Sequence, residues 1–475
     1  MAEITLGKKD IIWSYLAQFL SIGTGVITLP FILNKLSAAE IGLNYILITV
    51  GSVIALVDLG FAPQFARNFT YVFSGAKELK KEGVGTTSNE TNYELLAYLL
   101  KTARYIYGIL ALFALILLLA IGTPYVYKTT LGFSAVPNAQ FVWIIYSFGV
   151  LFQIFYSYYF SMLLGAGKVK EQKYAIIGNK ILYMTILISG LYLGAGLLSV
   201  ALAQLISPFL GRIIAYRYFY SQELKRSLYN HNANDKKRIF EILKILWYNA
   251  KRTAVMQIGA YAILRFSMFI AGLYLSLEDF ASYGLMIQLV GLLGTVSCTF
   301  MQISQPKFAS LRAHHEKRNL LASFSIALIV YYFLFVIGAI ILIIWGNEVL
   351  LLIKANATLP TGIVLTIYCI VMFLEYNHAN FAILISSDNK VPFAPASIVT
   401  GISVCIGIFT VVRFTTLGIL GLVIVQGVCQ GAYQNWKWPQ MALRNLSETY
   451  PHVLKIGLDT IYASLMSFTK SIFNK

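Results

Sequence analysis

Charged side chains are scarce in this chain, and acidic ones are the scarcest. Only 12% of the 475 residues are charged, with 20 Asp and Glu against 37 Lys and Arg, whereas an ordinary soluble domain is about 25% charged. This composition excludes a typical cytoplasmic enzyme. Hydrophobic residues make up 58% of the chain, enough for at most roughly thirteen helices of the ~20 residues that cross a bilayer. The sequence therefore predicts an integral membrane protein.

Cysteines are also few, and their placement argues against two kinds of site. The four cysteines, at positions 298, 369, 405 and 429, fall within apolar segments, and none belongs to a Cys-x-x-Cys pair. The sequence therefore predicts neither a disulfide framework nor a zinc site. There is no Walker motif, so direct ATP hydrolysis is not indicated either. We expect no cofactor and no bound metal.

Long apolar segments account for most of the chain. They are continuous runs, whereas the strands of a membrane barrel alternate apolar and polar residues. The sequence therefore predicts an all-α polytopic membrane protein with twelve transmembrane helices. These start near residues 12, 43, 104, 139, 174, 197, 252, 280, 321, 361, 393 and 417.

Basic residues are distributed unevenly between the connecting loops. If both termini are cytoplasmic, the inner segments hold 32 of the 37 Lys and Arg, and the outer loops hold only Lys35, Lys128, Lys354 and Arg413. Cytoplasmic loops of membrane proteins are enriched in bases. The bias therefore predicts a multi-pass protein with both termini inside. It also explains most of the net charge of +17 without any nucleic-acid partner.

A long basic connection divides the predicted spans six and six. The sequence of residues 36–41 also resembles that of residues 275–280, so a short motif recurs at the same place in each half. Because six is an even number, both halves would point the same way across the membrane, with a cleft between them. We expect an N-terminal lobe of residues 1–219, a cytoplasmic linker of 220–250, a C-terminal lobe of 251–438 and a cytoplasmic amphipathic tail of 439–475.

The first 70 residues carry a recognisable pattern. It consists of Trp13-Ser14-Tyr15, Leu29-Pro30, Ser37-Ala38-Ala39-Glu40-Ile41-Gly42 and Asp58-Leu59-Gly60-Phe61. This pattern resembles that of the Wzx-type polysaccharide flippases for O-antigen or capsule repeat units, within the multidrug/oligosaccharidyl-lipid/polysaccharide (MOP) exporter superfamily. The resemblance implies two pseudo-symmetric six-helix bundles, a MATE-like fold, in the bacterial cytoplasmic (inner) membrane.

The resemblance also implies a function and its partners. The substrate would be an undecaprenyl-pyrophosphate-linked oligosaccharide, moved from the inner to the outer leaflet by alternating access for surface polysaccharide such as lipopolysaccharide, with coupling to an ion gradient. Membrane lipids, a polysaccharide polymerase and a chain-length regulator are the other expected partners. One alternative is a MATE-like cation or drug antiporter. A second is a membrane-embedded polysaccharide polymerase or ligase, which the short outer loops disfavour.

An anionic lipid-linked pyrophosphate requires cations within the membrane. Arg265 is the strongest candidate because it lies within a span, where a charge costs at least ~2.5 kcal/mol. Tyr261 and Gln257 precede it at intervals of four and share its helix face. Three bases near the inner ends of spans are further candidates, although such residues also serve as interfacial anchors. They are Arg67, Lys180 and Arg212.

Two carboxylates within spans, Asp58 and Glu375, are candidates for coupling to a proton or sodium gradient. Asp58 has an alternative, structural interpretation, in which the sequence up to Pro63 distorts the helix and the carboxylate accepts freed backbone donors. Glu375 precedes His378 in a Glu-x-x-His pattern, but no second copy supports a metal site.

Polar and aromatic residues recur on other spans. Gln426, Gln430 and Gln434 are spaced four apart and would line one face of the last span, either at the cleft or at a helix–helix contact. Ser14, Gln18, Ser21, Gly25 and Thr28 would do the same on the first. The tyrosines at 156, 158 and 159 could stack on sugar rings, although interfacial belts also use such residues.

Overall fold

The structure is a computed structural model that describes residues 8–81, 90–229, 231, 233–264, 266–313, 316–386 and 392–473. Every regular element with assigned bounds in these residues is a helix. Nine of the described helices are long and apolar enough to cross a membrane, so the chain is an all-α multi-pass membrane protein. The other three predicted spans, which start near residues 12, 252 and 417, also begin in or next to helices. The count of twelve spans remains a prediction.

The described helices fall into two compact units. Unit 1 runs to Ile258 and includes Ser276–Glu278 and Lys354–Asn356, and unit 2 holds Gly259–Leu275, Asp279–Ile353 and Ala357 onward. The helices that lie wholly or mostly in unit 1 are α1 (Lys8–Lys35), α2 (Ala38–Ala55), η1 (Leu56–Asp58), α3 (Phe61–Phe73), α4 (Tyr93–Leu117), η2 (Leu118–Gly122), α5 (Thr123–Thr129), α6 (Ala139–Tyr156), α7 (Tyr158–Gly165), α8 (Val169–Tyr192), α9 (Leu198–Phe219), α10 (Gln222–Tyr229) and α11 (Lys236–Leu264).

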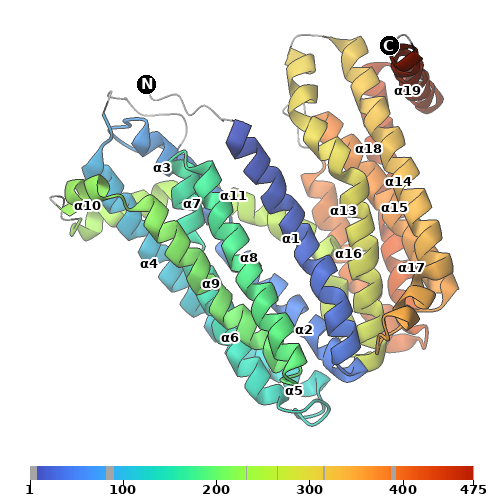
Figure 1. Cartoon of the computed structure of the whole chain (residues 1–475), viewed down its shortest axis with the longest axis horizontal. Helices are drawn as coiled ribbons and strands as arrows, with labels where there is room; N and C mark the ends of the chain where they lie inside the picture. The colour runs from blue at the N-terminus through green and yellow to red at the C-terminus, as the bar shows by residue number, and fades with distance from the viewer. Residues whose placement is uncertain are drawn as a thin grey trace. The chain divides into compact units, whose positions relative to one another are not determined.

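The long helices of unit 1 pack side by side (Figure 1). Helix α8 packs against α9 and α1, and α6 packs against α9 and α4. Within the segment predicted as a linker, α10 contacts α4, and α11 begins at Lys236 and continues beyond the predicted end of the linker at residue 250.

The turn between α1 and α2 is fixed by a capping box. The backbone amide of Ser37 donates to Glu40 Oε2 at 2.9 Å, and the amide of Glu40 donates to Ser37 Oγ at 3.3 Å. This reciprocal pair satisfies two amides that the helix itself leaves unpaired. The other carboxylate oxygen of Glu40 accepts the amide of Leu197 at 3.3 Å. The Ser37–Glu40 pattern therefore joins two turns of unit 1 that are distant in sequence.

The second predicted span is broken after Asp58. Leu59 and Gly60 have φ angles of 49° and 72°, in the left-handed region that favours glycine. The carboxylate of Asp58 accepts the amide of Ala62 at 3.2 Å and the hydroxyl of Tyr107 at 2.7 Å. These contacts agree with the structural interpretation of Asp58, because the carboxylate accepts a backbone donor freed by the break.

The helices of unit 2 form the second group in Figure 1. They are α12 (Phe266–Ala271), α13 (Leu277–Ala313), α14 (Lys317–Leu352), α15 (Gly362–Ser386), α16 (Ala394–Phe414), α17 (Gly418–Gly431), α18 (Gln434–Leu446) and α19 (Tyr450–Phe473). Helix α15 packs against α17 and α18, and α19 packs along α14. A Cβ on Gly457 would lie 2.9 Å from the carbonyl oxygen of Ser325, so glycine permits the close approach of α19.

The last predicted span is not one helix. Helix α17 ends at Gly431 and α18 begins at Gln434, so the prediction that Gln426, Gln430 and Gln434 line one face of a continuous helix is wrong. All three side chains are nevertheless buried. Spacing alone could not reveal the break, because glutamines four apart fit an unbroken helix equally well.

Candidate functional site

The residue expected at the centre of the site, Arg265, lies outside the described residues, and so does the side chain of Gln257. The side chains of Ser14, Gln18 and Ser21 on α1 are also outside them. Tyr261 is described and is partly buried on α11. The role of Arg265 in binding substrate therefore stays a prediction.

Arg212, another predicted residue, lies on the membrane-spanning helix α9 between tyrosine rings. Its guanidinium carbon is 5.5 Å from the ring centre of Tyr156 and 5.9 Å from that of Tyr216. Cations within about 6 Å of an aromatic ring centre are attracted by the ring quadrupole. Nε of Arg212 is buried without a hydrogen-bond partner, and no described acidic residue forms an ion pair with this side chain. Its positive charge is therefore uncompensated by any described carboxylate.

Arg212 lines a large cavity within unit 1, which we call the cation–tyrosine cavity. Its volume is about 1150 Å³, and its walls come from α4, the α6–α7 region, α9, α10 and the segment that follows α10. The described lining residues include no Asp or Glu. The polar ones are Lys101, Arg104, Tyr105, Tyr156, Tyr158, Tyr159, Arg212, Tyr216, Tyr220 and His231.

Sequence reasoning missed two of the three cations in this cavity. Lys101 and Arg104 were not among the predicted bases, but together with Tyr105 and Gly108 they are spaced at i, i+3, i+4 and i+7 on α4. Residues at these intervals share one helix face, so the spacing could have identified a polar face. The tyrosines at 156, 158 and 159 were noted in the sequence, and all three line the cavity.

Two other predicted bases of unit 1 lie elsewhere. Arg67 is exposed on α3, and its Nη2 donates to Oε1 of Gln64 at 2.6 Å. Lys180 is partly buried on α8. Neither residue belongs to the described lining of the cation–tyrosine cavity, so the structure groups only Arg212 of the predicted bases with this cavity.

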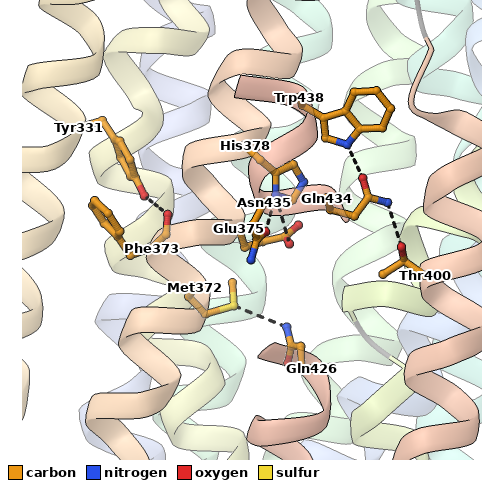
Figure 2. Close-up of polar contacts among 10 residues, drawn as sticks. All are labelled: Tyr331, Met372, Phe373, Glu375, His378, Thr400, Gln426, Gln434, Asn435 and Trp438. Atoms are coloured by element: carbon orange, nitrogen blue, oxygen red, sulfur yellow. Dashed lines mark hydrogen bonds and ion pairs between the residues drawn. The ribbon is translucent and has the colours of Figure 1, made fainter. Parts of the chain in front are cut away.

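Glu375, on α15 of unit 2, lies in a buried polar cluster (Figure 2). Its side chain is near His378 one turn later, with 3.7 Å between Oε2 of Glu375 and Nδ1 of His378. The same Nδ1 is 3.0 Å from Oδ1 of Asn435. Oε2 of Glu375 and Nδ2 of Asn435 have no hydrogen-bond partner although both are buried. Buried carboxylates in membranes are commonly ion or proton sites.

The glutamines near this cluster connect α15, α16, α17 and α18. Gln426 donates to the sulfur of Met372 at 3.7 Å, and Gln434 donates to Oγ1 of Thr400 at 3.1 Å. The indole of Trp438 donates to Oε1 of Gln434 (Figure 2). Two of the three predicted glutamines therefore bond to neighbouring helices, as polar residues of membrane helices commonly do. Both amide atoms of Gln430 are buried without partners.

The chain was compared with known proteins. No protein-family model and no curated protein matches the sequence. Among solved structures, it is similar to an inward-facing multidrug-resistance MATE family transporter of the MOP superfamily, with a TM-score of 0.61 and 14% identity, covering 93% of this chain and all of that one. It is also similar to the lipid II flippase MurJ in an inward closed conformation, with a TM-score of 0.62 and 14% identity, covering 97% of this chain and 92% of that one.

Both neighbours are transporters or flippases rather than enzymes. At 14% identity the likeness concerns the fold and not the substrate. The helices, the length covered and these two neighbours together show that this chain has the fold shared by the MATE family transporter and MurJ.

Proposed function

We propose that the protein is a Wzx-type flippase, which moves undecaprenyl-pyrophosphate-linked oligosaccharide repeat units from the inner to the outer leaflet of the bacterial cytoplasmic membrane. The observation that carries this proposal is Arg212, a cation on a membrane-spanning helix that has tyrosine rings around it and no described acidic partner. A guanidinium matches the geometry of phosphate oxygens. An uncompensated cation near the inner end of a span favours an anionic substrate.

The substrate chemistry distinguishes this proposal from its alternatives. A carrier for organic cations would favour carboxylates around its substrate, whereas the described residues of the cation–tyrosine cavity include three bases and no acid. The MurJ structure shows that this fold accommodates a flippase for a lipid-linked substrate. In the proposed orientation both termini are cytoplasmic, and a polymerase and a chain-length regulator would act on the flipped product.

One observation favours a second candidate function, a MATE-like cation antiporter. Glu375 is buried on α15, and one carboxylate oxygen has no hydrogen-bond partner, so such a group could bind a cation directly. Within the flippase proposal the same carboxylate couples export to a proton or sodium gradient.

Deletion and complementation in the host separate the two candidates. Deleting the gene should abolish surface polysaccharide while lipid-linked repeat units accumulate inside, and the wild-type gene should restore export. Complementation with Arg212→Gln should fail at equal protein level, whereas Arg217→Gln, which changes an exposed base of the same helix outside the cavity lining, should restore export. Persistence of polymer with increased drug sensitivity would favour the antiporter.

A further inference from the structure

We propose that the cation–tyrosine cavity of unit 1 binds the phosphorylated head group of a glycolipid, with Arg104 and Arg212 on the phosphate and the tyrosines against the sugar. The inference deepens the proposed function and rests on it for the identity of the lipid. Four features of the cavity support this assignment: its size, its charge, its aromatic lining and its apolar border.

The size of the cavity fits a large head group. Its volume of about 1150 Å³ slightly exceeds the ~300–1,000 Å³ typical of small-molecule sites. A lone phosphate would fill only a small part of it. The cavity therefore has space for a phosphate or diphosphate together with sugar rings.

The charges of the cavity select an anion. Three bases line it without a described acid, and their existing contacts leave donors available. Nζ of Lys101 donates to Oδ1 of Asn234 at 2.8 Å, which occupies one of its three protons. Arg104 has no hydrogen-bond or ion-pair partner among the described residues, and Arg212 forms no ion pair with a described acid. Several N–H donors thus remain for phosphate oxygens.

The aromatic lining supplies faces and hydroxyls for sugar rings. The rings of Tyr158 and Tyr159 have centres 4.5 Å apart, and those of Tyr216 and Tyr220 are 4.7 Å apart. Burial, with smaller contributions from Tyr159 and Tyr216, raises the pKa of Tyr220, although Arg104 acts in the opposite direction. The Tyr220 phenol therefore stays protonated at physiological pH and can donate a hydrogen bond. Such side chains combine an apolar face with a polar end.

An apolar border adjoins these polar groups. Ile109 and Leu112, which also line the cavity, are 66% and 57% exposed on the membrane-spanning helix α4. Ile116, one turn further along, is 53% exposed. Residues at these intervals form a continuous stripe on one side of a helix. A lipid with its head group in the cavity could therefore lay its hydrocarbon chain along α4.

The affinities of different lipids for the purified full-length protein test this assignment. Native mass spectrometry in detergent would compare three lipids: a polyprenyl diphosphate bearing an N-acetylhexosamine, the same polyprenyl diphosphate without sugar, and phosphatidylglycerol. We expect the glycosylated lipid to bind at least tenfold more tightly than phosphatidylglycerol and more tightly than the unglycosylated lipid. Equal affinity for all three lipids would mean a general site for anionic phospholipid and would overturn the proposal.

Matched variants locate the bound lipid. Arg104→Gln and Arg212→Gln should each weaken binding of both polyprenyl diphosphates at least tenfold. Arg217→Gln, which also removes one positive charge, is the control and should leave binding unchanged. Tyr105→Leu should weaken only the glycosylated lipid, with Tyr218→Leu as its control outside the cavity lining. Arg104 is exposed, so its substitution should leave the protein monodisperse. Unchanged binding in the Arg104 and Arg212 variants would overturn the proposal.

The two proposals can fail separately. Binding that depends on Arg104 without any flipping by the reconstituted wild-type protein would reject the flippase function and leave the cavity assignment intact. Flipping that persists in Arg104→Gln, together with unchanged lipid affinity, would reject the cavity assignment alone.

Discussion

At the residue scale, the account depends on a few polar side chains held in an apolar protein. Arg212 is positioned by the faces of Tyr156 and Tyr216 rather than by a carboxylate. A nearby acid would neutralise the charge that an anionic substrate needs, whereas aromatic rings hold a guanidinium and leave its N–H groups available. The tyrosines therefore position the base without neutralising it.

Lysine at position 212 should preserve part of this function. Arg212→Lys keeps the charge but loses the planar fork and the stacking on two rings, so we expect reduced export, while Arg212→Gln should reduce export to the level of the deletion strain. Surface polysaccharide measured at equal protein level checks both, with Arg217→Lys as the control. Normal export by Arg212→Gln would remove this residue from the mechanism.

Glu375 gives a second prediction at this scale. Its buried Oε2 has no hydrogen-bond partner and lies 3.7 Å from Nδ1 of His378, which suits a carboxylate that gains and loses a cation during transport. We expect export by Glu375→Gln to be low and unresponsive to collapse of the proton or sodium gradient. Glu348→Gln, an exposed glutamate on α14, should respond like the wild type. A gradient response retained by Glu375→Gln would exclude Glu375 from coupling.

At the scale of the elements, short motifs interrupt or join the helices at defined places. The Asp58–Gly60 break and the Ser37–Glu40 capping box lie within the segment that carries the family resemblance. Each motif satisfies backbone amides where a helix begins. The pattern at the start of the chain is therefore explained by local backbone requirements.

Gly60 should tolerate no side chain without a loss of stability. Its φ is 72°, and a non-glycine residue in the left-handed region costs about 1–2 kcal/mol. We expect Gly60→Ala to lower the unfolding temperature in detergent. Gly291→Ala is the control, because Gly291 lies within α13 and a Cβ there would meet nothing within 4 Å. Equal unfolding temperatures for Gly60→Ala and the wild type would contradict the strained break.

Glu40 should contribute more to the stability of the folded protein than an ordinary helix cap does. Glu40→Ala removes the acceptor for the amides of Ser37 and Leu197, and loss of a cap typically costs ~1 kcal/mol. Its unfolding temperature should fall below that of Glu241→Ala, which alters an exposed glutamate of α11. If the two variants unfold at the same temperature, the link between the two turns has no measurable effect on stability.

At the scale of the whole molecule, the sequence predicted the helical class and placed each apolar run in or next to a helix, because lipid requires long apolar runs with internal backbone pairing. The break between Gly431 and Gln434 was missed, since nothing in the glutamine spacing marks it. The cation–tyrosine cavity was missed as a unit because it joins α4 to residues more than one hundred positions away. Such juxtapositions depend on packing and not on periodicity.

The proposed orientation predicts which loops an impermeant thiol reagent can reach. In a chain whose four cysteines are replaced, Ser134→Cys in the exposed turn before α6 should be labelled in intact cells. Lys225→Cys on α10, which is also exposed, should be labelled only after the membrane is opened. The reverse pattern would contradict the positive-inside assignment of both termini.

Reconstituted flipping tests the central claim most directly. Purified protein in liposomes would be given a fluorescent polyprenyl-diphosphate-linked saccharide with an imposed proton or sodium gradient, and transfer between leaflets would be followed by quenching from outside. We predict rapid transfer by the wild type and by Arg217→Gln, and transfer at the protein-free rate by Arg212→Gln. Transfer by the wild type no faster than in protein-free liposomes, or equal transfer by Arg212→Gln, would contradict the account.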